Sequence, residues 1–337
     1  MPNTEIHLVK RPKGWPTLDC FKSVPTDIPT ADDGEFVIKT HYMSVDPYMR
    51  GRMNDTKSYI PSFDINEACQ AGIVGEITES KNDNFPVGSY VAGMGLWANY
   101  SKSKGDGMNI VPAGPLPLSY FISVLGMPGM TAHVGLMAIA GLKTGDNVYV
   151  SAASGAVGQV VGQIAKGMGC HVSGSAGSAD KVAYLTEELG FDTAFNYKTE
   201  RDLTEVLSEA NPKGIDVYFE NVGGPMLEAV LNVMNPHGRI AACGMIADYN
   251  NASIAEVSTA PRNMTMFIGK GIMMKGFIVS MYPDHCAEWA TKIGPKMLAE
   301  GKLKYRESIV EGVENAPQAF LDMLAGKNFG KQIVKLV

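Results

Sequence analysis

The pattern of apolar and polar positions changes along the chain at about Leu142. Before it, short β-like runs alternate with Gly and Pro, as in "GEFVIKTHYMSV", "AGIVGEITES" and "FPVGSYVAGMG". This pattern is typical of a compact, twisted antiparallel sheet or barrel. After it, apolar strands alternate with amphipathic helices at a repeat of roughly 20 to 25 residues, which indicates βαβ units. The sequence therefore predicts a β-rich first part and a second part built on a parallel sheet.

Six strands are predicted in the second part, at residues 147–152, 170–173, 193–196, 215–220, 239–243 and 276–279. Between the first two, Val157, Val160, Val161 and Ile164 recur at the spacing of one helix face. Gly169 then marks the end of that helix. Similar apolar spacings predict helices around residues 182–190 and 203–210.

The first predicted strand runs into the stretch "VSAASGAVGQ", residues 150–159, and a helix follows it. Ala152, Gly155 and Gly158 are spaced as in a glycine-rich dinucleotide fingerprint, with alanine in place of the first glycine. Such glycines let backbone N–H groups approach a pyrophosphate at the positive end of a helix. The context favours dinucleotide binding, and a purely structural tight turn is the alternative.

The end of the second predicted strand indicates which dinucleotide is bound. An NAD-binding protein usually has an Asp or Glu there to hold the ribose 2′-hydroxyl. This chain reads "SGSAGSADK", in which residues 173–179 are small and include no carboxylate. Lys181 follows within reach of a 2′-phosphate if the turn folds back, which favours NADP(H). The alternative is that Lys181 is a solvated charge on a helix.

Composition and charge disfavour several other classes of protein. The net charge is −6 without a basic cluster, so nucleic acid is not an expected partner. No apolar run reaches the ~18 residues of a membrane span. The N-terminal segment carries no signal-like apolar region, so we expect no membrane association and a cytoplasmic location. The five cysteines are scattered singly, without a C-x-x-C pair, which argues against a disulfide framework or a structural zinc site.

Seven blocks run through nearly the whole chain in order: "MSVDPYMRGRM" (43–53), "LGMPGMTAHVGL" (125–136), "SGAVGQVVGQIAKGMGC" (154–170), "FNYK" (195–198), "ENVGG" (220–224), "CGMIADYN" (243–250) and "GKNFGKQIV" (326–334). Together they resemble the medium-chain dehydrogenases/reductases. Within that superfamily they resemble the zinc-independent leukotriene/prostaglandin reductase and alkenal double-bond reductase family, which includes bacterial curcumin reductases.

The resemblance implies an α/β fold with a GroES-like, β-rich catalytic domain and a Rossmann domain whose doubly wound parallel sheet binds NADP(H). The first domain would comprise residues 1–122 and 300–337, and the second residues 123–299. The family also forms dimers through the edge of the Rossmann sheet. "MMKGFIVSM" (273–281) would be that edge strand, and an uncovered strand edge is a pairing surface. We therefore expect a homodimer.

The positions of catalytic zinc ligands in the larger superfamily carry other residues in this chain. Zinc-dependent members use a Cys in the early block and a Gly-His-Glu motif downstream. Here residues 44–47 read "SVDP" and residues 69–76 read "CQAGIVGE", with no histidine in either. Cys69 alone cannot complete a three-ligand catalytic site, and the six histidines are dispersed. The expected chemistry is therefore free of metal.

The resemblance further implies which residues contact the cofactor. For the pyrophosphate these are Gly155, Ala156, Val157 and Gly158. For the 2′-phosphate they are Lys181 and Tyr197. Elsewhere along the cofactor they are Asn221 and Asn328, and near the nicotinamide they are Cys243, Gly244, Met245, Phe277, Ile278 and Val279.

Without a metal, the expected reaction is delivery of hydride from NADPH to the β-carbon of an α,β-unsaturated ketone or aldehyde, followed by protonation. The protein must then supply orientation and a hydrogen-bond donor for the developing oxyanion. Tyr249 is the candidate, because it follows the fifth predicted strand and a phenol keeps its proton at neutral pH. The family also has a pocket tyrosine at this position. The alternative is an aromatic pocket wall without chemistry, with water or a ribose hydroxyl supplying the proton.

The expected substrate is a small, flat, conjugated carbonyl compound held by apolar and aromatic side chains. The candidate walls are Tyr48, Met53, Tyr59, Met127 and Tyr249, and core packing is the alternative for Tyr48 and Met127. Arg50 and Arg52 would either meet a carboxylated tail or form surface ion pairs. Two other functions stay open, a zinc-independent NADPH quinone reductase and a non-enzymatic NADP-binding protein, since a fold does not fix a function.

Overall fold

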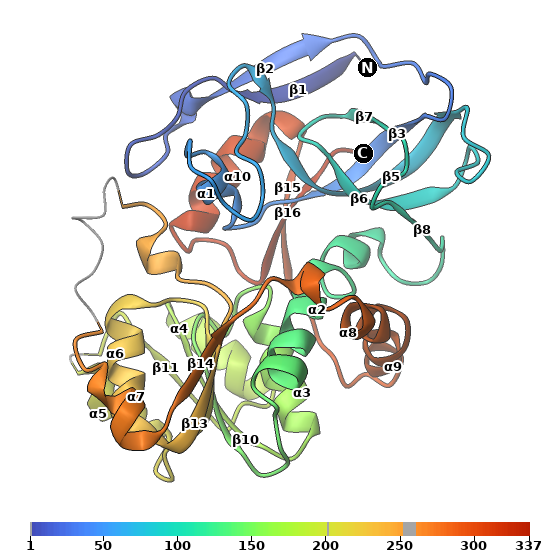
Figure 1. Cartoon of the computed structure of the whole chain (residues 1–337). Helices are drawn as coiled ribbons and strands as arrows, with labels where there is room; N and C mark the ends of the chain where they lie inside the picture. The colour runs from blue at the N-terminus through green and yellow to red at the C-terminus, as the bar shows by residue number, and fades with distance from the viewer. Residues whose placement is uncertain (1, 201, 252–260) are drawn as a thin grey trace. The chain divides into compact units, whose positions relative to one another are not determined.

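The chain divides into two units in the computed structural model, which describes residues 2–200, 202–251 and 261–337 (Figure 1). The first unit combines Met1–Ser123 with Glu307–Val337, and the second is Val124–Arg306. Residues 300–306, expected in the first domain, thus belong to the second unit. There the side-chain amide of Gln163 forms hydrogen bonds with the backbone N–H and the backbone oxygen of Lys304. The side-chain amide of Gln159 forms the same two bonds with Arg306. In the described part of the chain, no helix is long and apolar enough to cross a membrane.

The first unit contains two β-sheets. In the smaller one, β1 (Asn3–Leu8) pairs antiparallel with β2 (Phe21–Thr26) and β4 (Glu67–Ala68). The larger one has the order β15-β16-β3-β5-β6-β8, with β7 also paired to β3. Its strands are β3 (Phe36–Ser44), β5 (Gln70–Ser80), β6 (Tyr90–Leu96), β7 (Tyr100–Ser103), β8 (Asn109–Val111), β15 (Glu307–Glu311) and β16 (Lys331–Lys335). The strand β16 brings the C-terminal segment back to β3, with Ile333 opposite Ser44.

Among the described residues, two α-helices complete the first unit, α1 (Met49–Arg52) and α10 (Ala316–Leu324). In α10, buried apolar residues recur at helical spacing, including Ala319, Phe320 and Met323. They pack into one apolar core with Ile38 of β3 and Ile73 of β5. This core holds the helix and the strands of the first unit together. The unit is rich in β-strands, as the short β-like runs in the first part of the sequence predict.

The second unit is built on a six-stranded parallel sheet with the order β11-β10-β9-β12-β13-β14. Its strands are β9 (Asn147–Val150), β10 (His171–Ala176), β11 (Thr193–Asn196), β12 (Ile215–Glu220), β13 (Met234–Ala242) and β14 (Met273–Gly276). This order, in which the direction of winding reverses between β9 and β12, is that of a Rossmann sheet. The predicted α/β fold class, with a β-rich part and a doubly wound parallel sheet, is confirmed.

Four strand predictions need correction at their ends. β9 ends two residues early, because Ser151 and Ala152 belong to the following turn. β10 continues to Ala176, because its buried serines are satisfied inside the unit and so do not mark a loop. β13 begins before Arg239. β14 ends at Gly276, where the predicted strand 276–279 begins, so the edge strand is displaced toward the N-terminus.

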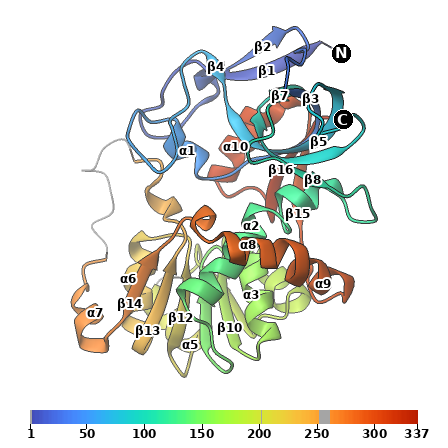
Figure 2. The same ribbon diagram turned by 45° about the vertical axis from the view of Figure 1, so that its right-hand side comes forward.

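Helices cover both faces of this sheet, with α5, α6 and α7 on one face and α2 and α3 on the other, and α8 packs against α2 (Figure 2). The helices of the second unit are α2 (Met127–Val134), α3 (Gly158–Gly167), α4 (Ala179–Ala183), α5 (Leu203–Ala210), α6 (Gly224–Val233), α7 (Thr265–Lys270), α8 (Pro283–Glu288) and α9 (Gly294–Ala299). Side chains cap two of them, Ser178 at α4 and Asp202 at α5. Three helices, α2, α4 and α8, continue into π-helical turns.

Candidate cofactor and active site

The predicted glycine-rich turn follows β9 and leads into α3. Ala152 has φ +47°, a left-handed conformation that costs an L-residue about 1–2 kcal/mol. It thus adopts the backbone that the missing glycine would favour. A Cβ on Gly158 would lie 2.6 Å from the oxygen of Ala152 and 2.7 Å from the Cα of Ala153, so only glycine lets α3 approach this closely. The half-buried residues Gly155, Ala156 and Val157 lead into the first turn of α3, where N–H groups lack intrahelical acceptors.

Two lysines and a tyrosine gather beyond β10 and β11. A Cβ on Gly177, the residue after β10, would lie 3.1 Å from Lys198 Cε and 3.3 Å from Tyr197 Oη. Lys181, in α4, is half-buried. Burial and the nearby charge of Lys198 both lower the pKa of Lys181. The ammonium groups of Lys181 and Lys198 repel each other, so a doubly charged anion bound between them would relieve that repulsion.

Lys198 belongs to this group, although only Lys181 and Tyr197 were predicted for it. The sequence contained the information needed to predict it, because Lys198 directly follows Tyr197 in the block "FNYK". The ammonium of Lys198 lies 6.0 Å from the centroid of the Tyr197 ring. Because β10 and β11 are parallel neighbours, their carboxyl ends bring residues 177 and 198 together.

Asn221 joins the ends of two neighbouring strands. Its side-chain amide donates to the backbone oxygen of Ser151 at 2.8 Å, and its backbone N–H donates to Ser151 Oγ at 3.0 Å. Ser151 follows β9 and Asn221 follows β12, the strands between which the sheet order reverses. In open α/β sheets, ligands bind outside the carboxyl ends of the strands at this switch point.

Glu220 is a buried carboxylate at the end of β12 that fixes the next turn. Its Oε1 accepts from the N–H of Val222 at 2.6 Å, from that of Gly223 at 2.9 Å and from Tyr218 Oη at 2.7 Å. Burial raises the pKa of Glu220, and the hydrogen bonds oppose that shift. Glu220 opens the block "ENVGG" but is not among the predicted site residues, because a glutamate at a strand end looks like a surface charge in the sequence.

The same strand end also holds the turn after β13. The backbone oxygen of Glu220 accepts from the N–H of Cys243 at 2.9 Å and from that of Gly244 at 3.1 Å. Burial raises the pKa of the Cys243 thiol to about 12, so it stays protonated at neutral pH. Cys243 therefore offers a neutral side chain at this position.

Tyr249 folds back onto this turn. A 3-10 turn over Ile246–Asp248 reverses the chain, and the N–H of Met245 donates to Tyr249 Oη over 3.4 Å. A Cβ on Gly244 would lie 3.0 Å from the same oxygen. Glycine at 244 therefore leaves room for the phenol to lie against the backbone.

The predicted cofactor and reaction residues of the second unit thus follow all six strands of one sheet. Parallel strands have their carboxyl ends at the same edge, so the loops after them share that edge. In sheet order these loops carry Tyr197 after β11, Lys181 after β10, Gly155–Gly158 after β9, Asn221 after β12, Gly244 and Tyr249 after β13, and Phe277, Ile278 and Val279 after β14.

The residues predicted in the first unit lie in different surroundings. Tyr59 is 61% exposed, whereas Met53 is 1% exposed and is part of the apolar core. Tyr48 is half-buried against that core. The side-chain amide of Asn328 donates to the oxygen of Gly330 at 2.8 Å. Of these four, Tyr59 is the most accessible to a small molecule, and Met53 packs as a core residue.

Both arginines of the early block are buried, so the expectation of surface ion pairs is wrong. Arg50 and Arg52 are 1% and 4% exposed. Arg50 donates to the oxygen of Gly14 at 2.7 Å, and Arg52 to that of Pro61 at 2.8 Å. Their guanidinium groups bind backbone acceptors of neighbouring loops. Met127, also predicted as a pocket wall, is half-buried at the start of α2 in the second unit.

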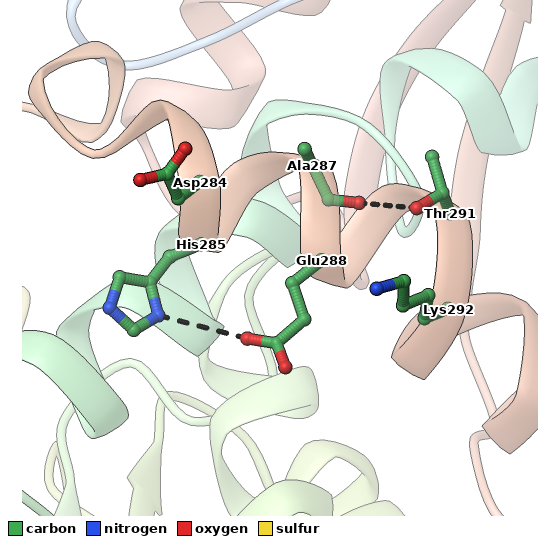
Figure 3. Close-up of a pocket in the computed structure, with 6 residues that line it drawn as sticks. All are labelled: Asp284, His285, Ala287, Glu288, Thr291 and Lys292. Atoms are coloured by element: carbon green, nitrogen blue, oxygen red, sulfur yellow. Dashed lines mark hydrogen bonds and ion pairs between the residues drawn. The ribbon is translucent and has the colours of Figure 1, made fainter.

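Three side chains of the second unit could hold a metal ion, although the sequence shows its histidines as dispersed. His133 comes from α2, and His285 and Glu288 come from α8. The potential ligand atoms all lie within 4.8 Å of one another. Figure 3 shows His285 and Glu288 on the same side of α8. None of the three is a residue predicted for the cofactor or the reaction.

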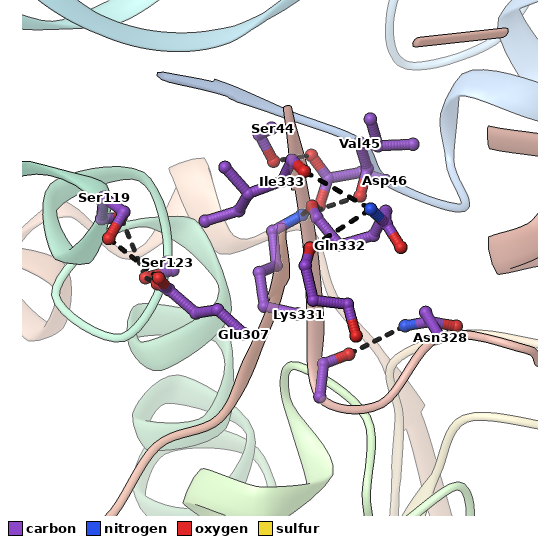
Figure 4. A network of polar contacts seen from close by, with 12 residues as sticks. Ser44, Val45, Asp46, Ser119, Ser123, Glu307, Asn328, Lys331, Gln332 and Ile333 are labelled. Atoms are coloured by element: carbon purple, nitrogen blue, oxygen red, sulfur yellow. Dashed lines mark hydrogen bonds and ion pairs between the residues drawn. The ribbon is translucent and has the colours of Figure 1, made fainter. Parts of the chain in front are cut away.

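At the early zinc-ligand position of the larger superfamily, a buried ion pair is present instead (Figure 4). Lys331 is 1% exposed, and its ammonium lies 3.0 Å from Asp46 Oδ1 and 2.6 Å from the oxygen of Val45. The hydroxyl of Ser44 donates to the same carboxylate of Asp46. Asp46 is thus engaged by protein groups, and Ser44 is a poor zinc ligand compared with the cysteine it replaces.

The fold and the loop chemistry define a two-unit oxidoreductase with a Rossmann-type sheet. Two families match the chain: one described as N-terminal domain of oxidoreductase at residues 4–111, and one described as zinc-binding dehydrogenase at residues 156–293. The NADPH-dependent curcumin reductase of Escherichia coli is 40% identical over 98% of this chain and 95% of its own length. The NADP(+)-dependent 2-alkenal reductase of Nicotiana tabacum is 44% identical over 89% of this chain and 87% of its own.

A solved structure is equally similar. The crystal structure of CurA from Vibrio vulnificus in complex with NADPH has a TM-score of 0.93 and 41% identity, over 99% of each chain. The chain therefore belongs to the medium-chain dehydrogenase/reductase family, in its zinc-independent reductase branch, as the sequence blocks predict.

Proposed function

We propose that this protein is an NADPH-dependent reductase of the carbon–carbon double bond of α,β-unsaturated ketones and aldehydes. The observation that carries the proposal is the position of Tyr249 Oη, which lies 3.4 Å from the backbone nitrogen of Met245 on a loop of the same sheet edge as the glycine-rich turn. A hydroxyl donor and a dinucleotide cradle on one edge are what hydride transfer to a conjugated carbonyl requires. The relatives named for curcumin and 2-alkenal reduction support this substrate class.

The cofactor assignment rests on the glycine turn and the lysines. Gly155, Ala156, Val157 and Gly158 would hold the pyrophosphate on the N-terminus of α3. Lys181, Lys198 and Tyr197 would hold the 2′-phosphate, because charge-assisted hydrogen bonds from two ammonium groups favour a dianion. Bound NADPH supplies the hydride.

The other cofactor contacts are assigned by their positions in the fold. Asn221 would meet the cofactor at the switch point of the sheet, whereas Asn328 is assigned to the cofactor by the family resemblance alone. Cys243, Gly244 and Met245 would lie near the nicotinamide, together with Phe277, Ile278 and Val279. The neutral Cys243 thiol adds no charge that would oppose the approach of an anionic dinucleotide.

Tyr249 would act on the substrate rather than on the cofactor. As the β-carbon accepts hydride, negative charge develops on the carbonyl oxygen, and a phenol O–H donates a hydrogen bond to it. The sequence also assigns Tyr59, Tyr48 and Met127 to the substrate; Tyr59 is exposed, and Tyr48 and Met127 are half-buried. No step needs a metal ion from this chain.

The two units have separate roles in this proposal. The first unit, with residues 1–122 and the C-terminal segment, would be the family's catalytic domain, and the second would bind NADP(H) and also carry Tyr249. We also propose a cytoplasmic homodimer paired through β14, because this strand is at the edge of the six-stranded sheet and Met273 on it is 44% exposed. An uncovered edge strand can pair with a second copy.

The test is a substrate panel with chelator-treated protein. Loss of NADPH absorbance is followed with enals, enones, an aryl dienone such as curcumin, and a quinone, and the products are identified. Saturated ketones or aldehydes are the expected products. Turnover of the quinone alone would instead identify a quinone reductase, and tight NADPH binding without any turnover would identify a binding protein.

A further inference from the structure

We propose that His133, His285 and Glu288 form a binding site for a divalent transition-metal ion, with Zn²⁺ as the best match. Two imidazole nitrogens and one carboxylate oxygen are ligands that Zn²⁺ commonly takes, with a water in the fourth position. This inference does not depend on the proposed reductase function, and the site contains none of the residues assigned to it.

The spacing of the potential ligands is close to what zinc needs. Zn–N and Zn–O bonds of about 2.0–2.2 Å at tetrahedral angles place neighbouring ligand atoms about 3.4 Å apart. His133 Nε2 lies 3.4 Å from Glu288 Oε2, and His285 Nδ1 lies 3.9 Å from the same oxygen. The distance from His285 Nδ1 must therefore shorten slightly when the ion binds. The side chain of His285 is 39% exposed, so it is able to rotate into place.

Local structure explains why these side chains converge. His285 and Glu288 are three residues apart in α8, a spacing that puts them on one helix face. Helix α2 packs on α8 and carries His133, whose side chain is 5% exposed. His133 thus lies next to Glu288, although the two residues are 155 positions apart in the sequence.

The ring of His133 is held by groups behind it. It stacks on Trp289 with a centroid distance of 5.7 Å. Trp289 is fully buried, and its indole N–H donates to the oxygen of Val124 at 2.8 Å. An imidazole oriented by a fixed partner loses little freedom when it binds a metal ion.

A route from solvent leads to the site. A shallow hollow of about 320 Å³ opens beside it, and its lining includes His285 and Glu288 (Figure 3). The neighbouring thiol of Cys286 is directed elsewhere, since its Sγ lies 3.4 Å from the oxygen of Val279. The proposed ligand set is therefore two histidines and a glutamate, without a thiolate.

Cobalt and zinc titrations of the full chain test the site. Chelator-treated protein, freed of chelator, is titrated with Co²⁺ while its visible d–d absorption is recorded, and Zn²⁺ is then used to displace it. We expect one Co²⁺ per chain, no thiolate charge-transfer band in the near ultraviolet, and at least tenfold weaker binding in His285→Ala and in Glu288→Gln. We also expect saturating Zn²⁺ to raise the melting temperature by about 4 °C in the wild type only.

The matched control is His7→Ala. His7 also contacts a carboxylate, with Nε2 2.8 Å from Glu5 Oε2, but this pair is not part of the three-ligand group. Metal binding should survive this change. Absence of stoichiometric binding in the wild type, or binding unchanged in both His285→Ala and Glu288→Gln, would overturn the proposal. Both variants change exposed or half-exposed side chains of α8, and circular dichroism checks their fold.

Discussion

The phenol oxygen of Tyr249 accepts a hydrogen bond from the backbone N–H of Met245, over 3.4 Å. A phenolic hydroxyl is both an acceptor and a donor, so accepting this bond is compatible with donation from its own O–H to a substrate oxygen. The loop after β13 thereby holds the hydroxyl in one place before any substrate arrives. Preorganised donors of this kind cost no reorganisation during the reaction.

Replacing Tyr249 by Phe should lower kcat for an enone by roughly 10²-fold or more, the usual effect of losing an oxyanion donor. The KM for NADPH should stay within about twofold, because the hydroxyl acts on the substrate. Steady-state kinetics from pH 6 to 9 measure both constants. Unchanged turnover across that range would make Tyr249 a pocket wall.

A methyl group at residue 244 should have a similar effect without touching the phenol itself. In Gly244→Ala the new Cβ would lie 3.0 Å from Tyr249 Oη, so the ring must move. We expect kcat to fall by about tenfold or more, since small displacements of a catalytic group are costly. Gly269→Ala is the control, because a Cβ there has nothing within 4 Å, and it should leave kcat unchanged.

The lysine pair should distinguish the two nicotinamide cofactors. Lys181→Ala and Lys198→Ala should each raise the KM for NADPH by about tenfold or more, because each removes a charge-assisted contact of roughly 1.5–3 kcal/mol. The KM for NADH, which lacks the 2′-phosphate, should not change. Lys166→Ala is the control, since that ammonium pairs with Asp192 at 2.8 Å. Equal losses for NADPH and NADH in the lysine variants would rule out a 2′-phosphate site.

The ion pair between Lys331 and Asp46 should matter for stability. Lys331→Met leaves a buried carboxylate without its cation, which typically costs about 3–5 kcal/mol. The double variant Lys331→Met/Asp46→Asn should lose less stability than Lys331→Met alone, because it has no uncompensated buried charge. Lys335→Met removes a more exposed cation, 3.8 Å from Glu311, and should cost less than about 1 kcal/mol. Urea unfolding compares the three variants, and a double variant less stable than Lys331→Met would contradict this account.

Much of the second unit could be predicted from the sequence, because strands and helices alternate there with clear periodicity. The strands β11 and β12 have the predicted bounds. The end of β10 could not be predicted, since the predicted strand stops at Ser173 and the small residues after it, Ser175 among them, look like a loop. In the structure the hydroxyls of Ser173 and Ser175 are buried and contact Asn211 and Tyr149, each at 2.7 Å.

Other features depend on residues that are distant in sequence. Lys198 gains its significance only from the neighbouring end of β10, beside Gly177. The burial of Arg50 and Arg52 follows from loop carbonyls that no periodicity reveals. His133 and His285 look unrelated until α2 packs on α8. Contacts of this kind join residues that are distant in sequence, so they cannot be predicted from the local pattern of apolar and polar positions.

The central claim is the destination of the hydride, and isotope transfer tests it most directly. The purified protein is given NADPH dideuterated at C4 of the nicotinamide together with an enone, and the product is analysed by NMR and mass spectrometry. We predict a saturated ketone with a single deuterium on the former β-carbon. Deuterium on the carbonyl carbon of an allylic alcohol would contradict the account, and so would an enone left unreduced.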